Sequence, residues 1–242
     1  MSSAAQGEIR QASTLSGPSF NMHFLITAGP TREPLDPVRY LTNRSSGKMG
    51  YALAVAAQAA GHEVTLISGP VMLPAPAGVH LVSVETAREM FEAVQAHLSS
   101  AQVAIFAAAV ADYRPAFAAT QKIKKKSETL TLELERTEDI LGSARSLFGF
   151  RGYLVGFAAE TEKLIEHAQD KLARKGCDLV IANDVSVPGI GFDSSENAVT
   201  LCLPGGETQV MPQQSKTSLA STLIRFIALR LTHQRSAEAW QS

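Results

Sequence analysis

The run of apolar side chains at residues 103–109 constrains the fold of this chain more than any other segment. Uninterrupted apolar runs of this length are typical of central parallel strands, which helices cover on both faces. Thr86 and Glu89 have the spacing of a capping box, which marks the start of a helix. Further strands are expected at residues 23–28, 62–68 and 79–84, and helices at residues 47–60 and 86–98. This order predicts an α/β fold with a doubly wound, mostly parallel, Rossmann-like sheet.

The second half of the chain returns to this pattern after an interruption. Residues 114–128 are polar and aperiodic, which is typical of a mobile loop, and residues 130–135 alternate like a strand with one exposed face. After them we expect strands at residues 153–157 and 178–182, a late β-hairpin at residues 197–203 and 208–211, and helices at residues 161–175 and 215–232. The chain is therefore interpreted as one α/β domain at residues 23–242, preceded by a disordered tail at residues 1–22.

Charge and composition exclude several classes of protein. The formal net charge of −1 over 242 residues gives no reason to expect binding to nucleic acid or to a membrane surface. No apolar run approaches the roughly 20 residues of a membrane span, and the N-terminal residues lack the order of a signal peptide. Cys177 and Cys202 do not have the spacing of a disulfide framework or a zinc site. These observations favour a cytoplasmic protein.

The segment NRSSGKMG at residues 43–50 comes directly before a predicted helix. Small residues there leave backbone N–H groups accessible, and the helix dipole favours an anion. The segment is not a P-loop, because its first glycine is absent and Met49 replaces the Ser or Thr. Two interpretations stay open: an anion site aided by Arg44 and Lys48, or a capped helix start with two solvated cations.

The segment AAAVADY at residues 107–113 ends the central strand, where ligands bind in open α/β sheets. Its alanines would let a ligand lie against the backbone, although they are equally typical of close packing. The chain lacks a GxGxxG motif after its first strand, which disfavours a dinucleotide site. The lysine-rich residues 122–126 could form a lid over phosphates or only keep a loop solvated. Lys171 and Lys175 share one helix face and could contact a triphosphate or only solvent.

Six segments in this order resemble the bacterial form of phosphopantothenoylcysteine synthetase. They are ITAGPTREPLDPVRY at residues 26–40, NRSSGKMG at 43–50, AAAVADY at 107–113, KIKK at 122–125, GFAAET at 156–161 and ANDVS at 182–186. Their order and spacing agree with the family from about residue 23 to residue 226. The first and third segments are long and specific, so a shared fold alone would not explain the likeness.

The resemblance implies a two-step ligation in coenzyme A biosynthesis. The carboxylate of 4'-phosphopantothenate would attack the α-phosphate of CTP, in the presence of Mg²⁺, to give an acyl-cytidylate and pyrophosphate. The amine of L-cysteine would then displace CMP. The resemblance also implies a homodimer, with the late β-hairpin as its interface. The chain has no room for the flavin-dependent decarboxylase that precedes the synthetase in many bacteria, so we expect a free-standing enzyme.

The resemblance also implies roles for individual residues. Asn43 would bind the pantothenate arm and orient the acyl intermediate, and Lys122 would be a catalytic lid lysine. The other substrate- and phosphate-binding residues would be Arg44, Ser45, Ser46, Gly47 and Lys48. The nucleotide site would be formed by Phe106, Ala107, Ala108, Asp112, Lys122, Glu138, Asp139, Ile140, Leu141, Phe157, Lys171 and Lys175. Glu138 departs from the family pattern, which has proline there, and no metal ligands are assigned.

Two other functions remain as alternatives at this point. A small-molecule kinase with a similar sheet would transfer a phosphoryl group to a hydroxyl and release a diphosphate. A non-catalytic nucleotide-binding module would bind CTP without consuming it. The products formed from CTP distinguish the three.

Overall fold

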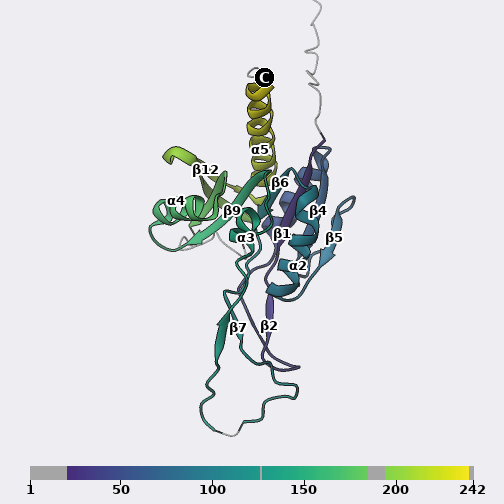
Figure 1. Cartoon of the computed structure of the whole chain (residues 1–242), viewed down its shortest axis with the longest axis vertical. Coiled ribbons are helices and arrows are strands. Elements are labelled where there is room, and N and C mark those ends of the chain that lie inside the picture. Colours follow the sequence, from purple (N-terminus) through teal and green to yellow (C-terminus); the bar gives the residue numbers. More distant parts are fainter. Residues whose placement is uncertain (1–20, 126, 185–193, 240–242) are drawn as a thin grey trace, which may run out of the picture.

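The protein is built around a single eight-stranded sheet with helices on both faces (Figure 1). This computed structural model describes residues 21–125, 127–184 and 194–239, and of residues 233–239 it describes only the backbone. In spatial order the strands are β12 (Thr208–Ser215), β11 (Glu196–Cys202), β10 (Leu179–Asp184), β9 (Tyr153–Glu160), β6 (Val103–Phe106), β1 (His23–Ala28), β4 (Glu63–Ser68) and β5 (His80–Ser83). The strands from β10 to β5 are parallel, and β11 and β12 are antiparallel. The predicted sheet and late hairpin are thereby confirmed.

Two layers of helices cover the sheet. Helices α1 (Lys48–Ala59) and α5 (Lys216–Ala239) pack on one face, and α2 (Ala87–His97), α3 (Ile140–Ser146) and α4 (Leu164–Lys175) pack on the other. Successive side chains of β1 point to opposite faces of the sheet, so this strand contributes to the hydrophobic core on each face. Phe24 and Ile26 pack in the core under α1 and α5, and Leu25 packs in the core under α2, α3 and α4. Short 3-10 turns η1 (Leu98–Ser100) and η2 (Pro204–Gly206) complete the elements.

The start of α2 confirms the predicted capping box. The Thr86 hydroxyl accepts a hydrogen bond from Glu89 N at 3.1 Å, and the Glu89 carboxylate accepts one from Thr86 N at 3.4 Å. Glu33, which is buried, accepts a third bond from Ala87 N at 2.8 Å. Since these bonds satisfy amides that an uncapped helix leaves unpaired, the local sequence fixes where α2 begins.

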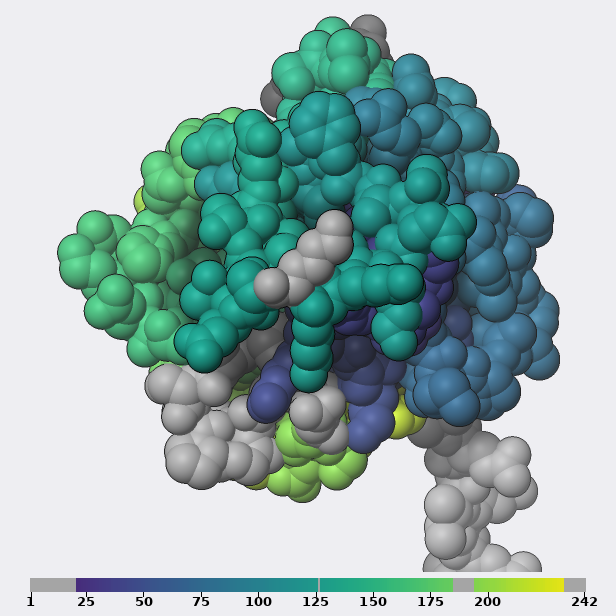
Figure 2. All heavy atoms as spheres, turned by 90° about the horizontal axis from the view of Figure 1, so that it is seen from below, coloured from purple at the N-terminus to yellow at the C-terminus, as the bar shows by residue number. Residues whose placement is uncertain are grey.

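Two small hairpins form an arm beyond the carboxyl ends of β1 and β6. We call the described residues of 32–42 and 113–136 the arm; it contains β2 (Arg32–Pro34), β3 (Tyr40–Thr42), β7 (Tyr113–Pro115) and β8 (Leu134–Arg136). It projects from the body in Figure 1, and Figure 2 looks along it onto the carboxyl edge of the sheet. The loop predicted at residues 114–128 therefore begins within strand β7. The strand predicted at residues 130–135 is shorter and later in the structure, where it is β8, and all residues of β8 are exposed.

Two predicted boundaries differ from the structure for identifiable reasons. The central strand ends at Phe106, where its pairing with β9 stops, although the amides of Ala107 and Ala109 still donate to the carbonyls of Thr27 and Gly29 at 3.2 and 2.9 Å. Beyond this point β6 and β9 are no longer paired, and the residues that follow Phe106 and Gly156 line a cavity. Met22 is buried in the core, so the folded domain begins before residue 23; residues 1–20 of the predicted tail lie outside the described residues.

None of the helices within the described ranges combines the length and the apolarity that a membrane span needs.

Candidate active site

A cavity of about 880 Å³ lies at the carboxyl edge of the sheet, where β1, β6, β9 and β10 end. Every predicted site residue except Lys122 lines it, although these residues come from five separate segments of the chain. Basic side chains outnumber acidic ones along its described wall. The cavity therefore suits ligands that carry several negative charges.

One wall of the cavity is the start of α1. Gly47, the N-cap, has a φ of 72°, and a Cβ on it would approach the Val71 side chain to 2.7 Å, so glycine is required there. Gly50 packs so closely on β1 that a Cβ would lie 2.5 Å from the Cβ of Ala28. Among the described residues no side chain caps this helix, and its first turn has no acidic residue. The amides and dipole at this end therefore favour an anion.

Asn43 lines the cavity shortly before the start of α1 and forms a hydrogen bond with the segment that follows the central strand. Its Nδ2 donates to the Val110 carbonyl at 2.9 Å, which fixes the orientation of the amide. Both residues line the cavity together with Asp112. The side-chain oxygen of Asn43 consequently has a defined direction from which it can accept a bond.

The opposite wall carries two lysines of α4. Lys171 donates to the Phe157 carbonyl at 2.8 Å, and burial lowers the pKa of Lys171. Lys175 pairs with Asp139, which caps α3 by accepting from Gly142 N at 3.0 Å. Burial alone would raise the pKa of Asp139, but the bonds from Lys175 and Gly142 hold it below its usual value. The two ammonium groups are thus held in place at this wall before any ligand arrives.

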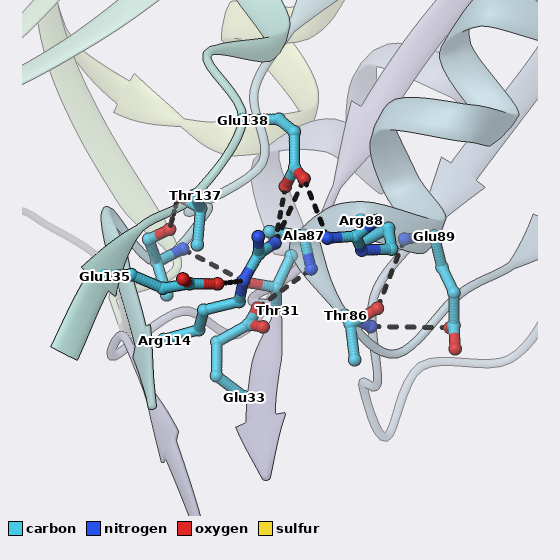
Figure 3. Close-up of polar contacts among 11 residues, drawn as sticks. Thr31, Glu33, Thr86, Ala87, Arg88, Glu89, Arg114, Glu135, Thr137 and Glu138 are labelled. Atoms are coloured by element: carbon cyan, nitrogen blue, oxygen red, sulfur yellow. Dashed lines mark hydrogen bonds and ion pairs between the residues drawn. The ribbon is translucent and has the colours of Figure 1, made fainter. Parts of the chain in front are cut away.

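Ion pairs anchor the loop that leads into α3 (Figure 3). Arg114 in the arm contacts both oxygens of Glu138, at 3.0 and 2.9 Å, and bonds Glu135 at 2.7 Å. Arg88 of α2 lies 3.5 Å from the same Glu138 carboxylate. Burial alone would raise the pKa of Glu138, but Arg114 holds it below its usual value. Glu138 therefore ties the cavity wall to both the arm and α2.

Lys122 lies outside the cavity lining, exposed in the arm. The next residue, Ile123, is tethered there: its amide donates to Asp36 and its carbonyl accepts from Arg39, both at 3.0 Å. Arg39 and the Ile123 amide also hold the pKa of Asp36 well below its usual range. The proposed role of Lys122 stays a prediction that requires the arm to close.

Several residues that line the cavity carry no assignment from the sequence. They are polar or charged and lie far apart along the chain: Arg136, Glu160, Arg174, Asn183, Asn197 and Lys216. Their neighbours in sequence give no local signal of a site, because folding alone brings them to one edge of the sheet. Glu160 and Asn183 are the exceptions, since they lie within the GFAAET and ANDVS segments.

Proteins of known sequence match this chain over most of its length. A family model, the DNA/pantothenate metabolism flavoprotein C-terminal domain, matches residues 20–230. The coenzyme A biosynthesis bifunctional protein CoaBC of Vibrio cholerae is 52% identical over 205 residues, which cover 84% of this chain and 51% of that protein. The protein of the same name from Escherichia coli K12 is 48% identical over 213 residues, covering 87% and 52%. The chain spans about half the length of the curated relatives it matches.

Solved structures agree with the sequence matches. The crystal structure of the C-terminal domain of CoaBC has a TM-score of 0.76 at 40% identity, and the match covers 90% of this chain and 100% of that one. A Cab2 mutant in complex with phosphopantothenate-cysteine has a TM-score of 0.71 at 16% identity, covering 92% and 89%, which shows a common fold. Because a family model matches residues 20–230 and a solved domain matches 90% of this chain over the whole of its own length, this chain belongs to the family of DNA/pantothenate metabolism flavoprotein C-terminal domains.

Proposed function

We propose that this chain is a phosphopantothenate–cysteine ligase that uses CTP. The observation that carries the proposal is that one cavity gathers all the implied substrate and nucleotide residues but one, with cationic groups at two separate walls. The 40% identity to the C-terminal domain of CoaBC supports it. So does the Cab2 complex, whose bound phosphopantothenate-cysteine is the product that such a ligase forms.

The walls of the cavity fit the chemistry of acyl-nucleotide formation. Attack of a carboxylate on the α-phosphate gathers negative charge, which fixed cations and backbone donors stabilise. Lys171 and Lys175 would hold the triphosphate from one wall. At the opposite wall, the amide of Asn43 would form a hydrogen bond with the pantothenate part of the substrate. This bond would bring the substrate carboxylate towards the phosphorus.

A magnesium ion would reach the site with the triphosphate. Within the ranges that the structure describes, no group of three or more His, Cys, Asp or Glu side chains could hold a metal by itself. Mg²⁺ is usually bound by one or two carboxylates together with substrate phosphates. Asp112, which lines the cavity, is the carboxylate that would serve, and the ion would neutralise charge on the phosphates.

We expect the purified chain to convert CTP into CMP and pyrophosphate only when 4'-phosphopantothenate is present, and to form phosphopantothenoylcysteine when L-cysteine is added. Mass spectrometry of the products, with CTP and ATP tested in parallel, measures this. Formation of CDP would instead indicate a kinase. Binding of CTP without turnover would indicate a module without catalytic function.

We further propose that the enzyme is a cytoplasmic homodimer. The arm exposes an unusual set of large apolar side chains for a part that projects into solvent: Val38, Tyr40, Tyr113, Phe117, Leu130, Leu132 and Leu134. The late hairpin, by contrast, exposes Val210 as its one large apolar side chain among the described residues. The arm is therefore a better candidate for the interface than the hairpin. Both cysteines are buried free thiols, which agrees with a reducing compartment.

A paired substitution in the arm tests the dimer. Leu130→Glu with Leu132→Glu is expected to convert a dimer into a monomer in sedimentation equilibrium, because charges would enter an apolar interface. Val210→Glu in the hairpin serves as the matched control. If Val210→Glu dissociates the dimer and the arm variant does not, the hairpin is the interface.

A further inference from the structure

Glu138, which lines the cavity, connects three parts of the chain (Figure 3). Nη1 of Arg114 in β7 contacts both oxygens of its carboxylate, at 3.0 and 2.9 Å, and Arg88 of α2 lies 3.5 Å from one of them. The side chains of Arg114 and Glu138 are 19% and 24% exposed, so solvent screens their attraction less than that of a surface ion pair. The arm and α2 together therefore fix the position of the Glu138 carboxylate.

Backbone groups attach the segment before Glu138 to the start of the arm. Thr137 N donates to the Asp112 carbonyl at 3.1 Å, and the Thr137 hydroxyl donates to the Ala111 carbonyl at 2.5 Å. Ala111 N donates in turn to the hydroxyl of Thr31, which is buried. These bonds hold the two ends of residues 113–136 together, next to residues that line the cavity.

Asp139, the next residue, contacts a different wall of the cavity. Its carboxylate pairs with Lys175 of α4 and accepts from Gly142 N at 3.0 Å. A Cβ on Gly142 would lie 2.3 Å from Oδ2 of Asp139, so the glycine leaves room for this carboxylate. Two consecutive carboxylates thus connect the arm and α2 with α4. A displacement of Glu138 would therefore shift Asp139, and with it the Lys175 ammonium.

The Glu138 carboxylate is poorly suited to contact a triphosphate or to transfer a proton. Its negative charge would repel phosphates, and it is already bonded to Arg114. Burial alone would raise the pKa of Glu138, but Arg114 holds it below its usual value, so the group stays ionised at neutral pH. A carboxylate that keeps both its charge and its partners acts on a ligand through those partners.

We infer that Glu138 is a positioning residue for CTP, which holds Asp139 and Lys175 in place through its ion pair with Arg114. The inference rests on the proposed function and adds to it a side chain that acts on the nucleotide without touching it. Because Arg114 belongs to the arm, the same pair makes the arm and this wall of the cavity one unit. The acyl substrate, which is proposed to bind at Asn43, should not be affected by the pair.

A double-mutant cycle on Glu138 and Arg114 tests the inference. Glu138→Gln and Arg114→Gln each remove the ion pair but keep a polar side chain. Each should raise the KM for CTP about tenfold, because a bond between charged groups in a partly buried place is lost. The double variant should also show a rise of about tenfold, rather than about a hundredfold, because both substitutions remove one interaction. The KM for 4'-phosphopantothenate should stay within about twofold of the wild type.

Glu135→Gln is the matched control for the loss of a carboxylate beside Arg114. Glu135 bonds Arg114 at 2.7 Å, but its side chain is 51% exposed and it is not among the residues that line the cavity. This variant should keep the KM for CTP within about twofold of the wild type. Isothermal titration with CTP provides a second measure of nucleotide binding, and melting curves check that each variant is folded.

Several results would overturn the inference. An unchanged KM for CTP, or effects that add in the double variant, would show that the ion pair does not position the nucleotide. A parallel rise in the KM values of both substrates would indicate a general loss of structure. An equal effect of Glu135→Gln would assign the change to charge in the arm. Failure of the proposed function looks different, because the wild type itself would then form no ligation product.

Discussion

Asn43→Asp is expected to lower kcat/KM for 4'-phosphopantothenate by about 10²–10³ while the protein stays folded. The substitution keeps the size of the side chain, removes its donors and adds a negative charge. The new carboxylate would face the Val110 carbonyl, to which Nδ2 now donates at 2.9 Å, and would repel the substrate carboxylate and phosphates. Asn43 is exposed, so the loss of this one bond should cost about 1 kcal/mol of unfolding free energy.

Steady-state kinetics and melting curves on the same preparations separate these effects. Gln58→Glu repeats the amide-to-carboxylate change on an exposed residue near the end of α1, away from the cavity lining, and should retain normal turnover. Normal turnover by Asn43→Asp would remove this residue from the site. Loss of activity that merely follows a lowered Tm would assign it a structural role.

Lys122→Gln is expected to slow turnover by about 10²–10³ and to change stability by at most about 0.5 kcal/mol. The small effect on stability follows because Lys122 is exposed in the arm and is not among the residues that line the cavity. The large effect on rate follows if the arm closes over the triphosphate, where the ammonium would meet charge that grows during carboxylate attack.

Lys125→Gln is the matched control for position, because it removes the same charge from the same exposed segment. Single-turnover rates for the two variants, each with a melting curve, distinguish a specific lysine from bulk charge. If both variants lose activity equally, or if neither loses any, Lys122 is not the lid lysine.

Most of the fold could be predicted from short-range patterns. The capping box of Thr86 and Glu89 is a local device, and the start of α2 agrees with it. The buried strands and the late hairpin follow from apolar runs and alternation. Residues 103–109 were predicted as one strand because a pattern of side chains cannot show where a neighbouring strand turns away. In the structure β6 stops pairing with β9 at Phe106, and the residues that follow, 107–110, line the cavity.

The arm shows what alternation cannot supply. Leu130, Leu132 and Leu134 alternate with polar or charged residues and so predict a strand with one buried face. In the structure they are 57%, 36% and 43% exposed, since no other part of the described chain covers them. Alternation identifies an apolar face, but the local pattern does not specify whether another part of the fold packs against it.

The site was predictable only where its residues form contiguous motifs. Asn43 to Lys48 and Ala107 to Asp112 were found because they flank predicted elements and match family segments. Asn197 and Lys216 carry no such signal, because a lone Asn or Lys is usually a surface residue. Their burial at the cavity arises from the way β11 and α5 return to the carboxyl edge, which only the assembled sheet reveals.

Transfer of a carboxylate oxygen tests the proposed ligation most directly. 4'-Phosphopantothenate labelled with ¹⁸O in its carboxylate would be mixed with the wild-type protein, CTP, Mg²⁺ and L-cysteine, and the phosphorus-containing products analysed by mass spectrometry. Attack of the carboxylate on the α-phosphate, followed by cleavage of the acyl–oxygen bond by cysteine, places one ¹⁸O atom in CMP and none in pyrophosphate. CMP without the label, or label that appears in CDP or inorganic phosphate, would contradict an acyl-cytidylate route and with it the function assigned to this cavity.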